Sequence, residues 1–365
     1  MRRIVLLSSL LVLMLSTSLF AQDKPSVKIG VAGLVHDHVH WILRQAKEGK
    51  VRMVGIAEPN RALAQRYADQ YGFSMDIVYP DIESMLEETE PEAVTAFNEI
   101  SNHLTVVQAC APQGIDVMVE KPLATNMGDA RQIAKLASQY DIEVITNYET
   151  TWYPSNHRVY AEVHEKKSIG DLRKVVVRDG HEGPKEIGVS DEFLSWLTDP
   201  EKNGGGALVD FGCYGANLIT WLMKGQRPES ITAVVQQIKP EIYPRVDDEA
   251  TIIVTYPKMQ GIIQASWNWP FGRKDMSVYG KTGYVYALNA ENMKIRKEGE
   301  FEEELNVEDS AFPYHDPFEY LSAVVRKEVI VKPSDLSSIE NNLVVVEILD
   351  AAKLSASSGS TIYLK

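Results

Sequence analysis

Three of the eight histidines in the chain lie in one short segment, GVAGLVHDHVH, which runs from Gly30 to His40. They follow an apolar run and are spaced two residues apart. On a strand, alternate side chains point to the same face, so this spacing could present imidazoles to one metal ion. The segment could also be the turn of a dinucleotide-binding motif in which some glycines have been replaced.

The elements on either side of the histidines argue against a metal. The run VKIGVAG at 27–33 predicts a strand and HWILRQAKEG at 40–49 predicts a helix, so the histidines straddle the junction. Residues two apart on a helix point about 200° apart, so His38 and His40 cannot easily share an ion. No further cluster of metal-ligating residues stands out in the sequence. We therefore expect no metal site.

A dinucleotide-binding turn needs glycines at three positions: for a tight turn, for close approach of the pyrophosphate, and for packing of helix on strand. Gly33 supplies the first, whereas Val35 and His38 stand at the other two. The helix N-terminus would still offer N–H groups and a positive dipole end to phosphate, and His36 and His38 could add donors. An alternative that stays open is that the histidines merely cap the helix.

An acidic residue should end the second strand of such a motif, where it binds the adenosine ribose. Glu58 ends the apolar run VRMVGIA at 51–57 and meets this requirement. A carboxylate there repels a 2′-phosphate, so Glu58 favours NAD over NADP.

Short apolar runs alternate with helical stretches through the first part of the chain. The runs occupy residues 27–33, 51–57, 92–97, 115–120 and 142–147. This alternation implies a parallel sheet covered on both faces. We predict an α/β fold with a doubly wound, Rossmann-type dinucleotide-binding domain over residues 22–147.

The pattern changes after residue 171, where strand-like runs joined by short turns indicate antiparallel pairing. A helix follows the glycines at 204–206, and another closes the chain. We predict an α+β domain over 148–365 with a large, open, mostly antiparallel sheet, against which the last helix packs. An open face usually needs a partner, so a homodimer or homotetramer through this sheet is expected.

Length, charge and cysteine content set outer bounds. A chain of 365 residues exceeds one ordinary core, which agrees with two domains. Its 51 acidic and 37 basic residues give a net charge of −14, which argues against nucleic acid or an anionic membrane as partner. Cys110 and Cys213 lie in apolar helical contexts and are expected to be free, buried thiols.

The first 21 residues have the layout of a signal peptide, with Arg2 and Arg3 before an apolar stretch at 4–15. That stretch is too short to span a bilayer, and a cut after Ala21 would leave no membrane span. We expect export to the periplasm by the Sec route. The paired arginines keep Tat export as an alternative.

Three more residues have the chemistry of a catalytic site. Lys121 follows a predicted parallel strand, at the carboxyl edge where ligands of doubly wound sheets bind. There it could polarise a substrate hydroxyl, or burial could lower its pKa. Asp210 and Tyr214 are four apart on a probable helix and share a face. The alternatives are a solvated lysine, a capping aspartate and a packed tyrosine.

Several motifs together resemble one family. GIDVMVEKPLATN at 114–126 resembles the Glu-Lys-Pro signature of the glucose-fructose oxidoreductase / inositol dehydrogenase / MocA family. The segment around Asn102 is similar to its Thr-Pro-Asn-x-x-His motif, and NGGGALVDFGCYGANLITWL at 203–222 to its second catalytic segment. VDDEATIIVTYP and the closing helix also match. The resemblance covers essentially the whole mature chain, in order.

The resemblance implies roles for the reactive residues. Tyr214 would accept the proton of a substrate hydroxyl, Lys121 would orient and tune it, and Asp210 would hold a neighbouring hydroxyl or the lysine. The hydride would go to the nicotinamide. The implied cofactor-binding residues are Gly33, Leu34, Val35, His36, His38, Glu58, Asn102, Glu120 and Lys121. The implied substrate-binding residues are Trp152, His181, Asp210 and Tyr214.

Some positions are less defined. Glu149 and His315, like His181, are plausible pocket lining, and Trp267 and Trp269 could stack on a sugar ring or belong to the core. Relatives often carry an arginine that helps to hold the cofactor at Thr150 or Thr151, and this chain does not.

The expected function is an exported NAD(P)-dependent oxidoreductase that acts on a secondary hydroxyl of a sugar, glycoside or cyclitol, with C3 as one candidate position. Free NAD is not plentiful outside the cytoplasm, so the cofactor should be tightly held. One alternative is a redox-neutral, NAD-dependent glycosidase that works by transient oxidation and elimination. The other is a carbohydrate-binding protein without chemistry on the same fold.

Overall fold

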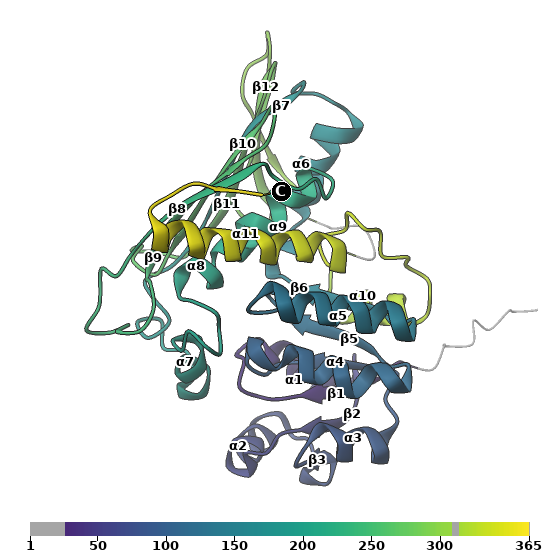
Figure 1. Cartoon of the computed structure of the whole chain (residues 1–365). Helices are drawn as coiled ribbons and strands as arrows, with labels where there is room; N and C mark the ends of the chain where they lie inside the picture. Colours follow the sequence, from purple (N-terminus) through teal and green to yellow (C-terminus); the bar gives the residue numbers. More distant parts are fainter. Residues whose placement is uncertain (1–25, 309–313, 365) are drawn as a thin grey trace, which may run out of the picture.

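A computed structural model describes residues 26–308 and 314–364. The expected signal peptide lies outside the described residues. Figure 1 shows two parts, each built on its own sheet. Within the described residues, no helix has the length and apolar character needed to cross a membrane.

The first part is a six-stranded, fully parallel sheet with the order β3-β2-β1-β4-β5-β6. Its strands are β1 (Lys28–Ala32), β2 (Arg52–Ala57), β3 (Val78–Tyr79), β4 (Ala93–Ala96), β5 (Asp116–Glu120) and β6 (Val144–Asn147). The central strands are almost wholly buried because helices cover both faces. This confirms the predicted Rossmann-type sheet and adds β3, a strand of two residues.

Helices of this part form two layers. The apolar faces of α1, α2 and α10 build one core against the sheet, and those of α3, α4 and α5 build the other. Their bounds are α1 (Val39–Lys47), α2 (Arg61–Tyr71), α3 (Ile82–Thr89), α4 (His103–Cys110), α5 (Met127–Tyr140) and α10 (Pro317–Val325). Asn60, Asp81 and Asn126 cap the N-termini of α2, α3 and α5 with side-chain oxygens. Local capping thus fixes where these helices begin.

The second part is a nine-stranded sheet with the order β14-β13-β12-β11-β7-β10-β9-β8-β15. Among the described strands of this sheet, only β7 and β10 pair in parallel, so the sheet is mostly antiparallel, as predicted. Its strands are β7 (Leu172–Gly180), β8 (Ser230–Gln236), β9 (Glu249–Thr255), β10 (Gln260–Ser266), β11 (Arg273–Gly280), β12 (Gly283–Ala287), β13 (Asn292–Lys297), β14 (Glu303–Asn306) and β15 (Ile362–Tyr363).

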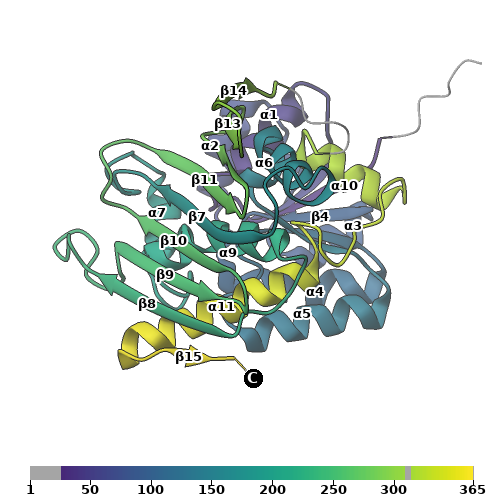
Figure 2. The same cartoon turned by 90° about the horizontal axis from the view of Figure 1, so that it is seen from above.

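Helices cover one face of the large sheet. Helices α8, α9 and α11 contact strands β7 to β10, and Figure 2 shows α9 and α11 lying along the sheet. Strand β9 alternates buried and half-buried residues, which leaves its other face open. The helices and short helical turns of this part and of the connections are α6 (Pro154–Tyr160), α7 (Asp191–Leu197), α8 (Ala207–Asp210), α9 (Gly212–Leu222), α11 (Ile339–Ser358), η1 (Met75–Ile77), η2 (Ile100–Asn102), η3 (Ala111–Gln113), η4 (Glu149–Trp152) and the π-helix η5 (Ala161–Glu165).

The last helix belongs to both cores. Val345, Ile348 and Leu349 of α11 pack in the core of the large sheet, whereas Val346 packs among residues of α3, α4 and α5. Cys110 and Cys213 are buried and free, as expected.

Removing a buried side chain of α11 should therefore destabilise the whole protein. Leu349 is 2% exposed, and Leu349→Ala removes buried methyl groups and leaves a cavity, which should lower the free energy of unfolding by about 2–5 kcal/mol. Leu354 lies on the same helix and is 54% exposed, so Leu354→Ala should change it by less than about 0.5 kcal/mol. Chemical denaturation of the three proteins measures both values. Equal losses would mean that α11 is only loosely attached.

Candidate active site

Lys121 and Asp210 form a buried ion pair between the two parts of the molecule. Lys121 directly follows β5, and Asp210 is the last residue of α8. The Lys121 Nζ donates to Asp210 Oδ1 at 2.5 Å and to the Asp210 backbone carbonyl at 3.2 Å. Both residues are 5% exposed. The predicted lysine is therefore a paired, buried cation at the carboxyl edge of the parallel sheet.

Each partner keeps the other charged. Burial works to lower the pKa of Lys121, but the adjacent Asp210 carboxylate raises it, and the pKa lies above the ordinary lysine value. Burial works to raise the pKa of Asp210, but the Lys121 ammonium lowers it below the ordinary value. Lys121 is thus a charged hydrogen-bond donor rather than a neutral base. Of the two roles that the sequence left open, polarising a substrate hydroxyl is favoured over acting as a lysine with a lowered pKa.

Asp210 is also held from the large sheet. Its second oxygen, Oδ2, accepts from the indole Nε1 of Trp267 at 3.0 Å. Trp267 is fully buried, so its ring positions Asp210 and is not free to stack on a sugar. His181, at the end of β7, contacts the ring of Phe211 at 4.9 Å, and its Nδ1 accepts from the Gly183 N–H at 2.9 Å.

Tyr214 lies beneath two ammonium groups. The Nζ atoms of Lys121 and Lys274 are 5.2 and 4.4 Å from the centroid of its ring, and the Tyr148 ring meets it edge-on. Burial, and then the negative charge of Glu149, raise the pKa of Tyr214 well above its ordinary value. Tyr214 therefore rests as a neutral phenol, and the two cations are the groups able to stabilise its phenolate.

Sequence reasoning missed Lys274 and Asp179, which face each other in register on β11 and β7. Lys274 pairs with Glu149, whose Oε1 also accepts from the Tyr153 hydroxyl at 2.5 Å. Although burial opposes it, Lys274 lowers the pKa of Glu149 to about 2. Asp179 is fully buried, and its Oδ1 has no hydrogen-bond partner among the described residues. Burial raises its pKa well above the ordinary value, against the opposing effect of Lys274.

The turn after β1 contains the predicted glycine. Gly33 has φ of +82°, and a Cβ there would lie 2.8 Å from the Asn98 Cβ, so the position requires glycine. Glu58 accepts from the Leu34 N–H and the Asn60 N–H, both at 2.8 Å. The residue predicted to bind ribose thus also holds the turn. Glu58 is buried, and burial raises its pKa.

The first two histidines converge on Glu120 at the end of β5. The His38 Nδ1 is 2.9 Å from Glu120 Oε2, and the His36 Nε2 is 3.9 Å from the same oxygen. The other oxygen, Oε1, accepts from Asn147 at 2.8 Å. His40 points elsewhere, to the Tyr71 hydroxyl at 2.8 Å. The grouping is therefore His36 with His38, which the sequence did not reveal.

This grouping has the spacing of a metal site, since one ligand atom from each of His36, His38 and Glu120 lies within 4.8 Å of the others. Its hydrogen bonds argue for another state. The Nδ1 of His36 accepts the backbone N–H of His38 at 3.1 Å, so the neutral ring carries its proton on Nε2. Burial lowers the pKa of His36 well below its ordinary value, which keeps the ring neutral. The His36 Nε2 thus carries a proton, and not a lone pair for a cation, and it has no hydrogen-bond partner among the described residues.

Helix α7 of the second part covers the turn. The Ser190 N–H and hydroxyl donate to the Asp37 carboxylate at 3.0 and 2.6 Å, and Trp196 Nε1 donates to the Val35 carbonyl at 3.1 Å. The Phe193 ring lies 4.7 Å from that of His36. Contacts from α7 and from Ser190 before it therefore hold the turn in which Val35 and His38 replace glycines.

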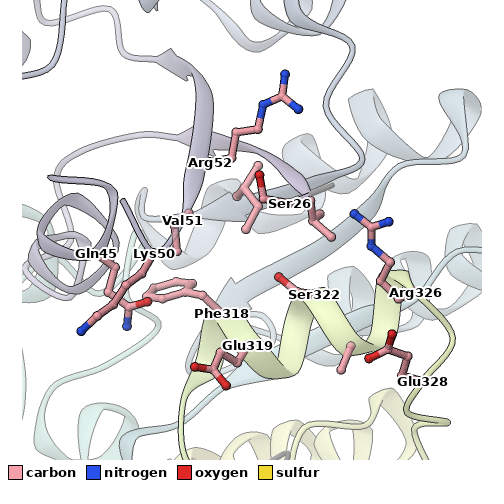
Figure 3. Close-up of a pocket in the computed structure, with 13 residues that line it drawn as sticks. Ser26, Gln45, Lys50, Val51, Arg52, Phe318, Glu319, Ser322, Arg326 and Glu328 are labelled. Carbon is pink, nitrogen blue, oxygen red and sulfur yellow. The ribbon is translucent and has the colours of Figure 1, made fainter. Parts of the chain in front are cut away.

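The remaining predicted residues make contacts of their own. Asn102 precedes α4 and donates to Glu99 at 2.7 Å. Trp152 follows β6 and donates from Nε1 to Asn147 Oδ1 at 2.9 Å. Thr150 and Thr151 are both buried. Another cavity, of about 320 Å³, lies at the opposite edge of the parallel sheet between β2 and α10 (Figure 3). It lies at the amino ends of β1 and β2, whereas Lys121 follows the carboxyl end of β5.

Comparison with known proteins gives one consistent result. Residues 27–148 match the oxidoreductase family with an NAD-binding Rossmann fold, GFO/IDH/MocA, and residues 157–286 match the GFO/IDH/MocA C-terminal domain. Trans-1,2-dihydrobenzene-1,2-diol dehydrogenase of Sus scrofa is 24% identical over 261 residues, which are 71% of this chain and 72% of that protein. The Bos taurus enzyme of the same name is 26% identical over 226 residues, 62% of this chain and 63% of its own length.

Solved structures share the fold at low identity. Aldose-aldose oxidoreductase from Caulobacter crescentus, complexed with glycerol, has a TM-score of 0.77 at 17% identity and covers 93% of this chain and 100% of its own. An inositol dehydrogenase homolog from Azotobacter vinelandii, complexed with NADH and myo-inositol, has a TM-score of 0.76 at 16% identity. It covers 93% of this chain and 98% of its own. Levoglucosan dehydrogenase, complexed with NADH and levoglucosan, has a TM-score of 0.75 at 18% identity. It covers 93% of this chain and 99% of its own.

The buried Asp179 should make stability fall as the pH rises. Its raised pKa means that the folded protein binds a proton which the unfolded chain releases above about pH 4, so folding is progressively disfavoured above that pH. Asp179→Asn removes this titration. The difference in free energy of unfolding, variant minus wild type, should therefore grow from pH 4 to pH 8 in denaturation experiments.

Asp171→Asn, on the exposed residue before β7, controls for the loss of one surface carboxylate. A difference for Asp179→Asn that stays constant with pH would show that Asp179 is ionised in the folded protein.

Proposed function

The chain belongs to the Gfo/Idh/MocA family of NAD(P)-dependent oxidoreductases, as its motifs predicted, and from this premise we propose that it oxidises a secondary hydroxyl of a sugar, glycoside or cyclitol with bound NAD. One observation carries the proposal. The Lys121–Asp210 ion pair and Tyr214 meet at the carboxyl edge of the parallel sheet, beside the dinucleotide turn.

The substrate class is supported by the relatives. Solved neighbours hold glycerol, myo-inositol or levoglucosan, and the curated relatives are named as dehydrogenases of a trans-diol. All of these are compounds with hydroxyl-bearing carbons. The site itself carries ion-paired and hydrogen-bonding groups suited to hydroxyls, namely Asp210, Lys274 and Glu149.

The turn after β1 suits a dinucleotide. It combines a left-handed Gly33, the N-terminus of α1 and a buried carboxylate at Glu58. Two buried polar atoms beside it, His36 Nε2 and Asn98 Oδ1, have no partner among the described residues, as expected if a ligand completes them. The backbone of the turn and His38 would hold the pyrophosphate, and Glu58 the adenosine ribose. Bound NAD supplies the hydride acceptor.

The chain's own residues handle the proton. Oxidation breaks the O–H and C–H bonds of the alcohol and forms a carbonyl, with the hydride leaving to the cofactor. Tyr214 first gives its phenolic proton to solvent water, and the phenolate, stabilised by the Lys121 and Lys274 ammoniums, then takes the hydroxyl proton of the substrate. Lys121 donates a hydrogen bond to the substrate oxygen as negative charge develops on it. In the reverse direction, the neutral phenol of Tyr214 is already the proton donor.

We also propose that the protein is exported to the periplasm, by the Sec route or, because of Arg2 and Arg3, by the Tat route. Export would require a tightly bound cofactor, which the fastening of α7 over the turn supports. NAD is favoured over NADP by Glu58. Association of two or four copies through the open face of the large sheet completes the proposal.

Two other functions would give different observations. A redox-neutral glycosidase would release the group attached to the sugar without accumulating NADH. A binding protein without chemistry would not need a buried charged pair, which is expensive to desolvate. The Lys121–Asp210 pair therefore favours an enzyme.

The proposal is tested first by denaturing freshly purified protein and measuring the released nicotinamide dinucleotide by mass spectrometry, with about one NAD(H) per chain expected. Sugars, glycosides and cyclitols are then screened by NADH absorbance and product analysis. Tyr214→Phe should lower kcat by roughly 10²–10⁴ through loss of the acid/base hydroxyl, while the NAD content stays unchanged. A variant as active as wild type would remove Tyr214 from the chemistry. Protein that neither contains nor binds NAD(H) or NADP(H) would refute the redox function.

Loosening α7 should speed the release of cofactor. Ser190→Ala with Trp196→Phe removes the hydroxyl bond to Asp37 and the indole bond to the Val35 carbonyl, and leaves the Ser190 N–H bond to Asp37 in place. Each lost bond is worth about 0.5–1.5 kcal/mol, so the dissociation rate should rise by roughly 10-fold or more. Thr198→Ala is the matched control, because its hydroxyl bonds only within α7, to the Leu194 carbonyl. Stopped-flow displacement of NADH measures the rates. Equal rates in all three proteins would mean that α7 does not retain the cofactor.

A further inference from the structure

A second cavity adjoins the reactive residues. It has a volume of about 460 Å³ and lies between the first turn of α1, the turn η4 and the connection from β12 to β13. We call it the outer pocket, and its principal lining residues are Trp41, Glu149, Trp152, Tyr153, Glu308 and His315.

The outer pocket is connected to the site of proton transfer through one ion pair. Glu149 lines the pocket and pairs with Lys274, whose Nζ lies 4.4 Å from the centroid of the Tyr214 ring. On its other side, Trp41 stacks on His38 with ring centroids 4.4 Å apart. The outer pocket and the ring of Tyr214 are therefore separated by the Glu149–Lys274 ion pair.

The outer pocket lies away from the expected adenosine site. Its residues Glu149, Trp152 and Tyr153 follow β6, at one end of the strand order, whereas Glu58 follows β2 near the other end. Helix α7, which covers the turn, contributes none of its described lining. The pocket is thus on the side where the reacting end of a bound substrate would lie.

The lining has the chemistry of a sugar-binding surface. Trp41, Trp152 and Tyr153 offer aromatic faces on which the C–H face of a sugar ring can pack. Glu291 and Glu308 offer carboxylate acceptors for hydroxyls. Among the described residues that line it there is no lysine or arginine, so the pocket repels phosphate and other anions.

We propose that the outer pocket binds the second ring of a two-ring glycoside whose first ring is oxidised beside Tyr214. The proposal rests on the proposed function and narrows its substrate to uncharged disaccharides and aryl or sugar glycosides. The volume lies in the range of small-molecule sites, roughly 300–1,000 Å³, and leaves room for one ring in addition to the ring at Tyr214. Contacts made by the second ring should appear mainly as a higher kcat/KM for the longer substrate.

A blocking variant tests the proposal. Ala290 lines the outer pocket and touches none of the reactive residues, so Ala290→Trp fills the cavity from the connection between β12 and β13. Leu288→Trp is the matched control, because Leu288 lies in the same connection, is 42% exposed and is not part of the lining. The NAD-loaded proteins are compared on methyl β-glucoside with cellobiose, methyl α-glucoside with maltose, and methyl β-galactoside with lactose.

We expect at least one disaccharide to exceed its methyl glycoside in kcat/KM by roughly tenfold or more in wild type and in Leu288→Trp. Ala290→Trp should remove this advantage and leave turnover of the methyl glycoside unchanged. Equal kcat/KM for both members of every pair, or an advantage that survives in Ala290→Trp, would overturn the proposal.

The same pairs separate failure of this proposal from failure of the proposed function. If no sugar is oxidised, tryptophan fluorescence titrations still report binding, since Trp41 and Trp152 line the outer pocket. Tighter binding of a disaccharide than of its methyl glycoside, lost in Ala290→Trp, would support the pocket and refute the oxidation. Absence of binding by all six sugars would overturn the pocket as well.

Discussion

The buried ion pair of Lys121 and Asp210 is the constraint on which the site depends. Lys121 follows a strand of the parallel sheet and Asp210 ends helix α8 of the second part, and each residue stays charged because the other is 2.5 Å away. Separating them would leave two uncompensated charges in a dry interior, which is far more unfavourable than the pair itself. The pair therefore fixes the distance between the parallel sheet and α8. The position of Tyr214 follows from it, since α8 and α9 are almost continuous.

The dinucleotide turn shows how a fold can keep a site after losing part of its motif. Val35 and His38 occupy positions where glycines are usual, and the backbone there is held by Glu58 from one side and by α7 from the other. His38 uses its side chain to contact Glu120, a residue that the parallel sheet already places at the same edge. The shape of the turn thus depends on these side-chain contacts and not on two further glycines.

The sequence allowed the two sheets to be predicted, because apolar runs and the turns between them are local signals. Lys121, Asp210 and Tyr214 were singled out by the motifs that resemble the family, and their catalytic roles stay predictions. It did not predict α7, whose importance comes from contacts with Asp37 and Val35 far away in the chain. Lys274 and Asp179 were missed for the same reason, since pairing of β11 with β7 brings them together. Glu58 was found by its position, but its hydrogen bonds to the turn could be seen only in three dimensions.

The order in which the two cores are completed has a consequence for the life of the chain. Phe318 and Leu321 of α10 and Val346 of α11 fill the Rossmann cores, although that domain is otherwise encoded by the first 150 residues. When the six parallel strands have been synthesised, the residues of α10 and α11 that complete their cores have not. The first domain cannot reach its full stability until the last helices emerge, so part of its apolar surface stays uncovered for nearly the whole of the chain's synthesis.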